Sequence, residues 1–588
     1  NSRFDNFFLA DEGIKRDTMK DILFVQNSIL NFKLGGRHES LDLCRFIATS
    51  LKNACGSFKT NPKKLEGFSH REPQEAFEKD RLIEWITEND EKLVEYNKLD
   101  VLSLADLTFK YDKANRQLLN DIDFSESNTI SGLSWEAFNN TNEEEIPCPR
   151  DYITDNQIRK SLTAGRTQCY FGLNKFNMDL RMVDVVSLYP FVMMNRQFPV
   201  GEYKYTKEYR ADKLGIYSCE IIHQNLKWKN PDRIKKSFEE FKKIDIECYN
   251  RMTDSQRDYA PVVYPLRTED EPLNWNYRDT MKCKLSSIDI ENIRAYGGEV
   301  NIIQEWDTKE GEKWGGIYWE ESTDKIFKEF LGKCMEEKNR QDELKKADND
   351  DYNPALREAC KLVSNSLSGK VIQRNFEETM DYLKDSKALD KFLNRTVEST
   401  QIIEFFGSNM VYGKGKLKEE FVYNEKKAKP SYLGIFIYAH ARNYMYKTLL
   451  GSYTCIYQDT DSALLPLWEY ERLIQEKAEL FPFTRNKKYG DLEEEVGEAN
   501  LAYTIAPKCY SVLNKDDEDA RERGLLEYKN KCNAKRKFKG IKMNDKWELF
   551  NETSKKEFRK TYKVDDKMIK TKLDKEKNVF TKGMMEHL

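Results

Sequence analysis

Two aspartates lie between two apolar runs in the segment Tyr457-Gln458-Asp459-Thr460-Asp461-Ser462. Residues 453–457 form the first run and residues 463–465 form the second. Apolar runs joined by a short polar turn predict a pair of hydrogen-bonded strands, with both carboxylates at the hairpin tip. Carboxylates fixed in this way can hold a hard divalent cation, because Mg²⁺ binds carboxylate oxygens in proteins. The alternative is a solvated turn, since Asp and Ser favour turns in any protein.

A third carboxylate is Asp184, near the end of the strand-like run 179–188. A single aspartate at a strand end is more often a cap or a turn residue. Together with Asp459 and Asp461, however, it would complete a site for two metal ions about 3.5–4 Å apart, which activate the attacking oxygen and stabilise the leaving oxygen. The three aspartates therefore predict phosphoryl-transfer chemistry.

Two charged helices, 325–346 and 354–367, are expected on either side of a turn that contains Pro354, which predicts an antiparallel helical hairpin. On the second helix Arg357, Lys361 and Asn365 recur every four residues, so they share one face. Two cations and an amide on one face can bind a triphosphate, and a movable helix could close over a nucleotide. The alternative is a solvated charged face.

The remaining pattern alternates between the two kinds of secondary structure. Residues 215–222 resemble a further strand, and residues 432–449 predict a mostly apolar helix just before the run 453–457. We therefore expect a mixed α/β protein with a projecting helical pair.

Composition limits the class of protein. At 588 residues the chain exceeds the size of one hydrophobic core, so we expect roughly three or four compact units. Its 97 Lys and Arg against 101 Asp and Glu give a net charge of -4, so any nucleic-acid binding must come from local basic patches. Twelve cysteines without a C-x-x-C pair predict a reduced intracellular protein without structural zinc. The sequence has no run of about 18 apolar residues and no apolar signal core, so we expect neither a membrane span nor secretion.

Three motifs in order resemble motifs A, B and C of the family B DNA polymerases: Asp184-x-x-Ser187-Leu188-Tyr189-Pro190, Lys361-x-x-x-Asn365-Ser366 and Tyr457-x-Asp459-Thr460-Asp461-Ser462. Lys508-Cys509-Tyr510 is similar to the family's Lys-x-Tyr motif at the primer terminus, and the basic run 535–542 falls in the expected thumb. Upstream, Gly165-Arg166-Thr167 resembles the Gly-rich motif that links exonuclease and palm and touches the template.

The resemblance implies an α/β (α+β) fold, a right-hand polymerase with palm, helical-hairpin fingers and thumb, preceded by a truncated ribonuclease H-like exonuclease domain. The implied division is a partial 3′-5′ exonuclease-like domain at 1–130, linker and first part of the palm with an insertion at 131–324, fingers at 325–375, second part of the palm with an insertion at 376–503, and thumb at 504–588.

The resemblance also implies a role for each motif residue. Catalysis falls to Asp184, Asp459 and Asp461, and two Mg²⁺ ions, with Mn²⁺ as a substitute, are bound by Asp184, Asp461 and the Val185 carbonyl. Tyr189 resembles the steric gate that excludes a ribose 2′-hydroxyl. Nucleotide binding is implied for Ser187, Leu188, Tyr189, Arg357, Lys361 and Asn365. DNA binding is implied for Gly165, Arg166, Thr460, Lys508, Tyr510 and Lys539. The implied partners are primer-template DNA and deoxynucleoside triphosphates.

The N-terminal part resembles the exonuclease of the same family less completely. Residues 1–5, ending in Asp5, are similar to its second motif, and Tyr96-Asn97-Lys98-Leu99-Asp100 is similar to its third. Ser50-Leu51 resembles a single-strand-binding motif of the protein-primed branch, found in phages, adenoviruses, linear plasmids and Polinton-type elements, which implies a terminal priming protein as a further partner. The first exonuclease motif should precede Asn1, so we expect no proofreading by this polypeptide alone.

Ser368 departs from the family, which usually has Tyr at this place in motif B. A small hydroxyl in place of an aromatic ring predicts looser selection of the correct base pair; restoring Tyr should lower the error rate, and an unchanged error rate would count against the hypothesis. Two alternatives stay open. One is a nucleic-acid-primed polymerase of the same family, and the other is a DNA-binding replication scaffold that does not polymerise. The host compartment stays open as well.

Overall fold

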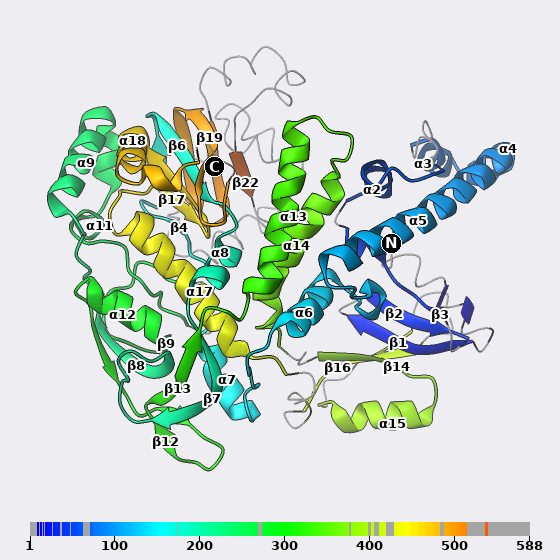
Figure 1. Ribbon diagram of the computed structural model, residues 1–588, viewed down its shortest axis with the longest axis horizontal. Coiled ribbons are helices and arrows are strands. Elements are labelled where there is room, and N and C mark those ends of the chain that lie inside the picture. The colour runs from blue at the N-terminus through cyan, green and yellow to red at the C-terminus, as the bar shows by residue number, and fades with distance from the viewer. Residues whose placement is uncertain are drawn as a thin grey trace. The chain divides into compact units, whose positions relative to one another are not determined.

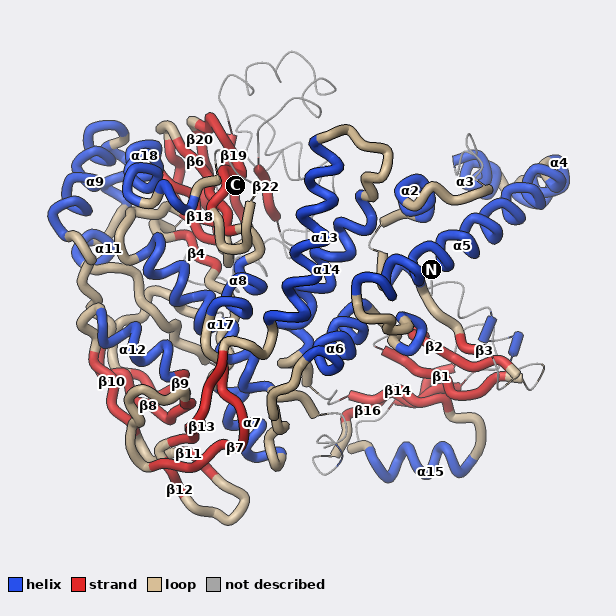
Figure 2. Tube along the Cα trace, viewed as in Figure 1, coloured by secondary structure: helices blue, strands red, loops and turns tan. Residues whose placement is uncertain are grey.

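The computed structural model describes residues 9–10, 12–13, 16, 18–25, 28–35, 38–47, 49–62, 71–172, 174–268, 273–374, 378–397, 401–404, 411–418, 421, 428–482, 487–513 and 535–538. The chain folds into two compact units, which the element labels of Figures 1 and 2 allow the reader to follow. The first unit contains residues 1–144, 148–151 and 325–430, and the second contains residues 145–147, 152–324 and 431–588.

The first unit contains two small antiparallel sheets. One has the order β1 (Met19–Val25), β2 (Ser28–Leu34), β3 (His38–Glu39), and the other has the order β14 (Glu378–Tyr382), β16 (Val411–Lys416), β15 (Gln401–Glu404). An apolar cluster joins the two sheets, since the buried Ile29 and Phe32 of β2 pack with Met380 of β14 and Tyr412 of β16. Segments far apart in the sequence therefore share one core.

Helices make up the rest of the first unit: α2 (Leu51–Ser57), α3 (Arg71–Glu78), α4 (Leu82–Glu88), α5 (Asp90–Leu118), α6 (Ile130–Thr141), α13 (Lys328–Lys346), α14 (Pro354–Lys370) and α15 (Ser386–Arg395). Three aromatic side chains fix the end of α5, because the Tyr111 ring meets Phe124 edge-on at 5.1 Å and Phe124 meets Phe46 in the same way. The Ser134 hydroxyl of α6 donates to the Val363 carbonyl of α14 at 2.9 Å.

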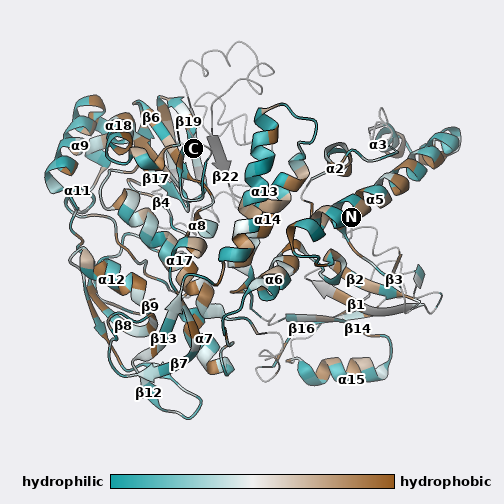
Figure 3. Ribbon diagram, viewed as in Figure 1, coloured by the Kyte–Doolittle hydropathy of each residue, from teal (hydrophilic) through white to brown (hydrophobic). Residues whose placement is uncertain are grey.

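The pair α13 and α14 confirms the predicted helical hairpin. Asn353 caps α14, because its side chain accepts a hydrogen bond from the Leu356 N–H at 3.0 Å, and Pro354 follows in the first turn. Ala359, Val363 and Leu367 form the buried stripe of α14. Figure 3 shows α13 coloured mainly as hydrophilic, which agrees with its run of charged residues. The hairpin is thus anchored by α14 and charged along α13.

The second unit is built on an antiparallel sheet with the order β19 (Leu492–Ala499), β6 (Leu180–Val185), β18 (Ser462–Pro466), β17 (Tyr457–Asp459), β4 (Thr167–Cys169). Helix α17 (Ser431–Met445) is buried at every residue except Asn443 and Tyr444, as expected for a helix that is apolar on nearly all sides. It contacts α7 (Tyr152–Lys160), α8 (Leu188–Asn195) and α12 (Ser287–Ala295), and so forms the centre of this unit's core.

The described part of the second unit contains two further sheets of four or more strands. One has the order β10 (Glu299–Ile302), β8 (Gly215–His223), β13 (Gly316–Thr323), β7 (Phe198–Thr206), with β9 (Met281–Ser286) also paired to β8. The other has the order β22 (Lys535–Phe538), β21 (Cys509–Leu513), β20 (Leu501–Ala506), β5 (Asn174–Phe176). The smaller elements are β11 (Trp306–Asp307), β12 (Lys313–Trp314), α9 (Pro231–Ile244), α10 (Ile246–Arg251), α11 (Asp254–Asp258) and α18 (Leu467–Glu476).

Two predicted boundaries are corrected by the structure. The apolar helix ends at Met445 and continues as a π-helical turn to Leu450, and the strand expected at 453–457 starts only at Tyr457. The reason is that the Tyr453 N–H donates to the Leu449 carbonyl at 2.9 Å, so this part of the apolar run closes the helical turn instead of pairing. Across the described ranges, the helices are all too short or too polar to cross a bilayer.

Candidate active site

The register of the β6, β18 pair brings Asp184 and Asp461 to neighbouring places. Asp184 lies directly opposite Ser462, and the Val185 N–H donates to the Asp461 carbonyl at 2.9 Å. Directly opposed residues on antiparallel strands have Cβ atoms about 4.5–5.5 Å apart. Backbone hydrogen bonds therefore fix the separation of the two carboxylate-bearing residues, although 276 positions lie between residue 184 and residue 461 in the sequence.

The hairpin tip between β17 and β18 is held in an unusual backbone conformation. Thr460 has a φ of 64°, and its N–H donates to the Arg166 carbonyl at 2.7 Å. A Cβ on Gly165 would lie only 2.8 Å from the Thr460 hydroxyl oxygen, so this close approach requires glycine. The segment 165–167, matched to the linker motif, thus supports the tip that carries the two aspartates.

Asp459 is buried, and a cation and a hydroxyl contact the same oxygen. The Lys508 ammonium forms an ion pair with Asp459 Oδ1, and the Thr167 hydroxyl donates to that atom at 3.3 Å. Lys508 has a φ of 63°, and its N–H donates to the Tyr457 hydroxyl at 3.0 Å. The structure therefore joins Lys508, predicted to hold DNA, to an aspartate of the hairpin.

Tyr510 lies beside the carboxylates. Its ring packs on Tyr457 with 4.2 Å between centroids, and its buried hydroxyl makes no hydrogen bond to the described residues. Burial raises the pKa of this phenol well above its ordinary value, and the charges of Asp459, Asp184 and Asp461 are among the further causes. The charges of all three predicted aspartates thus act on one phenol.

Tyr189 is the second residue of α8, after Leu188, and the N-cap residue Ser187 has a φ of 51°. Its ring meets Tyr438 of α17 edge-on at 5.1 Å. Burial is the main cause that raises the pKa of Tyr189, and the neighbouring Tyr438 and the charge of Asp461 raise it as well. Leu188 is buried in the core, whereas Ser187 and Tyr189 are half-buried. The structure thus places the predicted steric gate near the predicted metal ligand Asp461.

A further carboxylate near this centre was missed by the sequence reasoning. Glu493 on β19 lies directly opposite Asp184, on the side of β6 away from β18, and forms an ion pair with Lys487. The acidic residues at 491 and 493 were a visible signal, but only the sheet order shows that their strand adjoins β6. Asp184 therefore lies between Glu493 of β19 on one side and Ser462, which follows Asp461, on the other.

The metal-binding capacity of this centre rests on hard oxygen donors. No group of three His, Cys, Asp or Glu side chains arranged to hold a metal occurs in the described ranges. The predicted set is smaller, with two carboxylates from Asp184 and Asp461 and the Val185 carbonyl. Mg²⁺ typically uses one or two protein carboxylates and completes its shell with water and substrate phosphate. The residues present therefore fit Mg²⁺ that arrives with a nucleotide.

The predicted triphosphate-binding residues lie on α14 in the first unit. Arg357 Nε is 2.5 Å from Asp342 Oδ1 on α13, and the same carboxylate is 3.5 Å from the Lys338 ammonium. Burial alone would raise the pKa of Asp342, but these two cations lower it below its ordinary value. Lys361 is exposed, and the Asn365 carbonyl accepts a hydrogen bond from the buried Ser368 hydroxyl at 2.9 Å. Arg357 is thus already paired, whereas Lys361 faces solvent.

The other predicted residues lie in varied surroundings. Arg166 is buried, with its guanidinium 4.5 Å from the centre of the Trp275 ring, and burial lowers its pKa. Its carbonyl, rather than its charge, reaches the hairpin tip. Tyr96 and Asp100 share a half-buried face of α5. Asp5 and Lys539 lie outside the described residues. The DNA and exonuclease roles of these five residues stay predictions.

Comparison with known proteins identifies relatives at both the sequence and the fold level. The family described as DNA polymerase type B, organellar and viral, matches residues 1–454. A DNA polymerase of Kluyveromyces lactis is 25% identical in an alignment 509 residues long, which covers 78% of this chain and 44% of that protein. Uncharacterized protein 075R of Invertebrate iridescent virus 3 is 29% identical over 121 residues, which are 21% of this chain and 74% of that protein. The chain thus spans less than half of the Kluyveromyces lactis relative.

Solved structures with a similar fold include the Phi29 DNA polymerase in an orthorhombic crystal form. It has a TM-score of 0.57 at 16% identity, over 92% of this chain and 83% of that one. The Phi29 enzyme complexed with primer-template DNA and incoming nucleotide has a TM-score of 0.56 at 17% identity, over 89% and 78% of the two chains. The mixed α/β architecture therefore resembles a right-hand polymerase. Because the family match covers well over half of its length, the chain belongs to the type B DNA polymerases of organelles and viruses.

Proposed function

We propose that this chain is a template-directed DNA polymerase that adds deoxynucleotides to a primer 3′-hydroxyl by two-metal phosphoryl transfer. The observation that carries the proposal is the pairing of β6 with β18, which fixes Asp184 beside the hairpin that bears Asp461. Phosphoryl transfer needs charge and position more than covalent help from the protein, so two preset carboxylates are its central requirement.

Asp184 and Asp461 would hold two Mg²⁺ ions with the Val185 carbonyl. When bound, such ions lower the pKa of the attacking hydroxyl and stabilise charge on the leaving oxygen. Asp459 would assist these two residues. Its ion pair with Lys508 holds its carboxylate in place. The protein thus supplies fixed negative charge before the substrate arrives, so little reorganisation is needed.

Substrate contacts are proposed for the other motif residues. Tyr189 would support the deoxyribose and exclude a ribose, and Arg357, Lys361 and Asn365 would bind the triphosphate. Lys508 would contact the primer strand through phosphate and sugar, since a polymerase must accept every sequence. Tyr510 would hold the same strand together with Lys508, and its hydroxyl is buried and without a hydrogen bond among the described residues.

The mode of priming is proposed from the family and the fold. The match to organellar and viral polymerases and the likeness to the Phi29 enzyme support protein-primed replication of a viral, plasmid or transposon genome, with a terminal protein as partner. The finer division into exonuclease-like domain, palm, fingers and thumb belongs to the same proposal.

The test is primer extension by the full chain on a short template with Mg²⁺ and four deoxynucleotides, beside its Asp461→Ala variant. We expect extension by the wild type and none by the variant, with DNA binding kept by both. Absence of extension by both, with DNA still bound, would favour a replication scaffold instead.

A further inference from the structure

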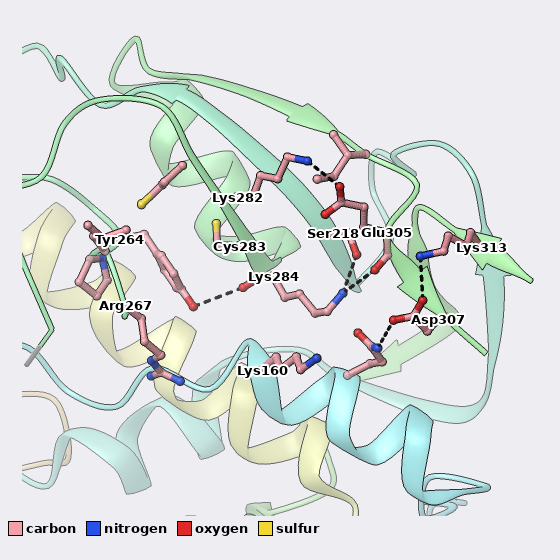
Figure 4. Close-up of a pocket in the computed structure, with 15 residues that line it drawn as sticks. Lys160, Ser218, Tyr264, Arg267, Lys282, Cys283, Lys284, Glu305, Asp307 and Lys313 are labelled. Atoms are coloured by element: carbon pink, nitrogen blue, oxygen red, sulfur yellow. Dashed lines mark hydrogen bonds and ion pairs between the residues drawn. The ribbon is translucent and has the colours of Figure 1, made fainter. Parts of the chain in front are cut away.

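A cavity of about 500 Å³ lies in the second unit, lined by α7, β8, β9 and the segment that contains β11. None of the residues assigned above to metal, nucleotide or DNA lines it. Figure 4 shows its side chains converging from these separate elements. Its volume lies within the range of small-ligand sites, so it can take a group of nucleotide size.

The cavity has more cations than its carboxylates can neutralise. Glu305 forms an ion pair with Lys282 at 2.6 Å, and Asp307 forms one with Lys313 at 3.1 Å. Both acidic residues that line the cavity are therefore already paired. Three further cations line the same space from three different segments: Lys160, Arg267 and Lys284. The cavity thus has a surplus of positive charge.

Lys284 is half-buried, whereas Lys160 and Arg267 are exposed, and several contacts hold its ammonium in place. It donates to the Ser218 hydroxyl at 2.7 Å and to the Glu305 carbonyl at 3.1 Å, and it lies 4.9 Å from the centre of the Trp306 ring. Burial, and after it the charge of Lys160, lowers the pKa of Lys284 to about 8. An anion between the two lysines would relieve both effects.

We propose that this cavity is a second phosphate site, which binds a phosphate monoester from a free nucleotide or from the end of a DNA strand. A phosphate monoester has a charge of about -1.5 to -2 near neutral pH and three acceptor oxygens, which matches cations arriving from several directions. A carboxylate offers one charge and two oxygens, and would leave most of the surplus uncompensated. The proposal concerns the cavity alone and does not depend on polymerase activity.

The test is isothermal titration of the full chain with a deoxynucleoside 5′-monophosphate, and separately with inorganic phosphate, in EDTA so that no divalent cation assists. We expect one site that Lys284→Gln weakens by about 10- to 100-fold, since it removes a charge-assisted hydrogen bond. Asp307→Asn should tighten binding several-fold because it removes a negative charge while keeping the shape. Absence of binding, or equal affinity in wild type and Lys284→Gln, would overturn the proposal.

Two controls separate this cavity from other cationic surfaces. Lys204→Gln removes a lysine of β7 that is paired with Glu320 outside the cavity, and it should leave affinity unchanged. Lys361→Ala removes a proposed triphosphate ligand, and it should also leave affinity unchanged; loss of binding in that variant would assign the site to the polymerase instead.

Oligonucleotides with and without a 5′-phosphate distinguish the two sources of the phosphate, a free nucleotide and the end of a DNA strand. A Lys284-dependent preference for the phosphorylated strand identifies a strand end, and binding of the mononucleotide alone identifies a free nucleotide.

Discussion

The carboxylates of the central sheet and the cations of α14 are positioned by different forces. Asp184 and Asp461 are fixed by backbone pairing, including the 2.9 Å hydrogen bond from Val185 to the Asp461 carbonyl. Arg357 is positioned by its contact with Asp342, and both side chains are about one-third exposed. Ion pairs of this exposure contribute about 0–1 kcal/mol, so they rearrange easily.

The difference indicates that the carboxylates and the cations respond differently to substitution and to substrate. A strand ladder keeps its geometry when one side chain is changed, so removing a carboxylate should affect chemistry without disturbing the sheet. A side-chain ion pair on a helix can be exchanged for another partner, such as a substrate phosphate. We infer that the positions of the two carboxylates are preset, whereas the α14 cations can exchange their present partner for a substrate phosphate.

The largest effect is expected from removing one of the two carboxylates of the central sheet. Asp184→Ala should reduce nucleotide incorporation at least about a thousandfold, because it removes one of two carboxylates that act as a unit, while DNA affinity stays nearly unchanged. Single-nucleotide incorporation and a DNA-binding titration measure the two quantities. Glu494→Gln is the matched control, since this acidic residue of β19 lies in the same sheet with a 3.6 Å contact to Arg181. Substantial synthesis by Asp184→Ala would refute the assignment.

A smaller effect is expected from removing a cation of α14. Arg357→Ala and Lys361→Ala should each raise the KM for deoxynucleotides about 10- to 100-fold, as expected for loss of a charge-assisted contact to phosphate. Steady-state kinetics with varied nucleotide concentration provide the measurement. Lys346→Ala at the end of α13 serves as a control for loss of a helix cation. An unchanged KM in both test variants would remove α14 from nucleotide binding.

Substitution of Gly165, which packs against the hairpin tip, should have a moderate effect. Gly165→Ala places a methyl group against the Thr460 side chain, so the tip must shift and incorporation should fall about tenfold, with a stability loss of about 1–3 kcal/mol. Incorporation assays and thermal unfolding measure both. Gly332→Ala on α13 has open space around its new methyl group and should change neither incorporation nor stability by much. Normal activity in Gly165→Ala would mean that the tip does not need this contact.

The smallest effect is expected from changing Asp342, the partner of Arg357. Asp342→Asn should lower the KM for deoxynucleotides about two- to fivefold, because it weakens the competitor that pairs with Arg357. The same kinetic assay detects the change, and the double variant with Arg357→Ala should show no such gain. A raised KM in Asp342→Asn would indicate that the ion pair positions Arg357 for substrate rather than competing for it.

Local patterns in the sequence predicted much of this arrangement. Apolar runs around Asp459 and Asp461 predicted the hairpin, and Pro354 predicted the turn between α13 and α14, because both depend on nearby residues. The contacts of Gly165 with Thr460, of Lys508 with Asp459 and of Asp184 with Glu493 were not predicted. They join residues distant in the sequence, and only the tertiary fold brings them together.

The assignment of Asp184 and Asp461 as paired metal ligands is tested most directly by Mn²⁺ binding. The full chain, held on a dideoxy-terminated primer with the next nucleotide, would be titrated with Mn²⁺ and followed by electron paramagnetic resonance. We predict that Asp184→Asn and Asp461→Asn each lose most of this binding, whereas Glu494→Gln keeps it. Mn²⁺ binding at wild-type strength in both aspartate variants would contradict the account.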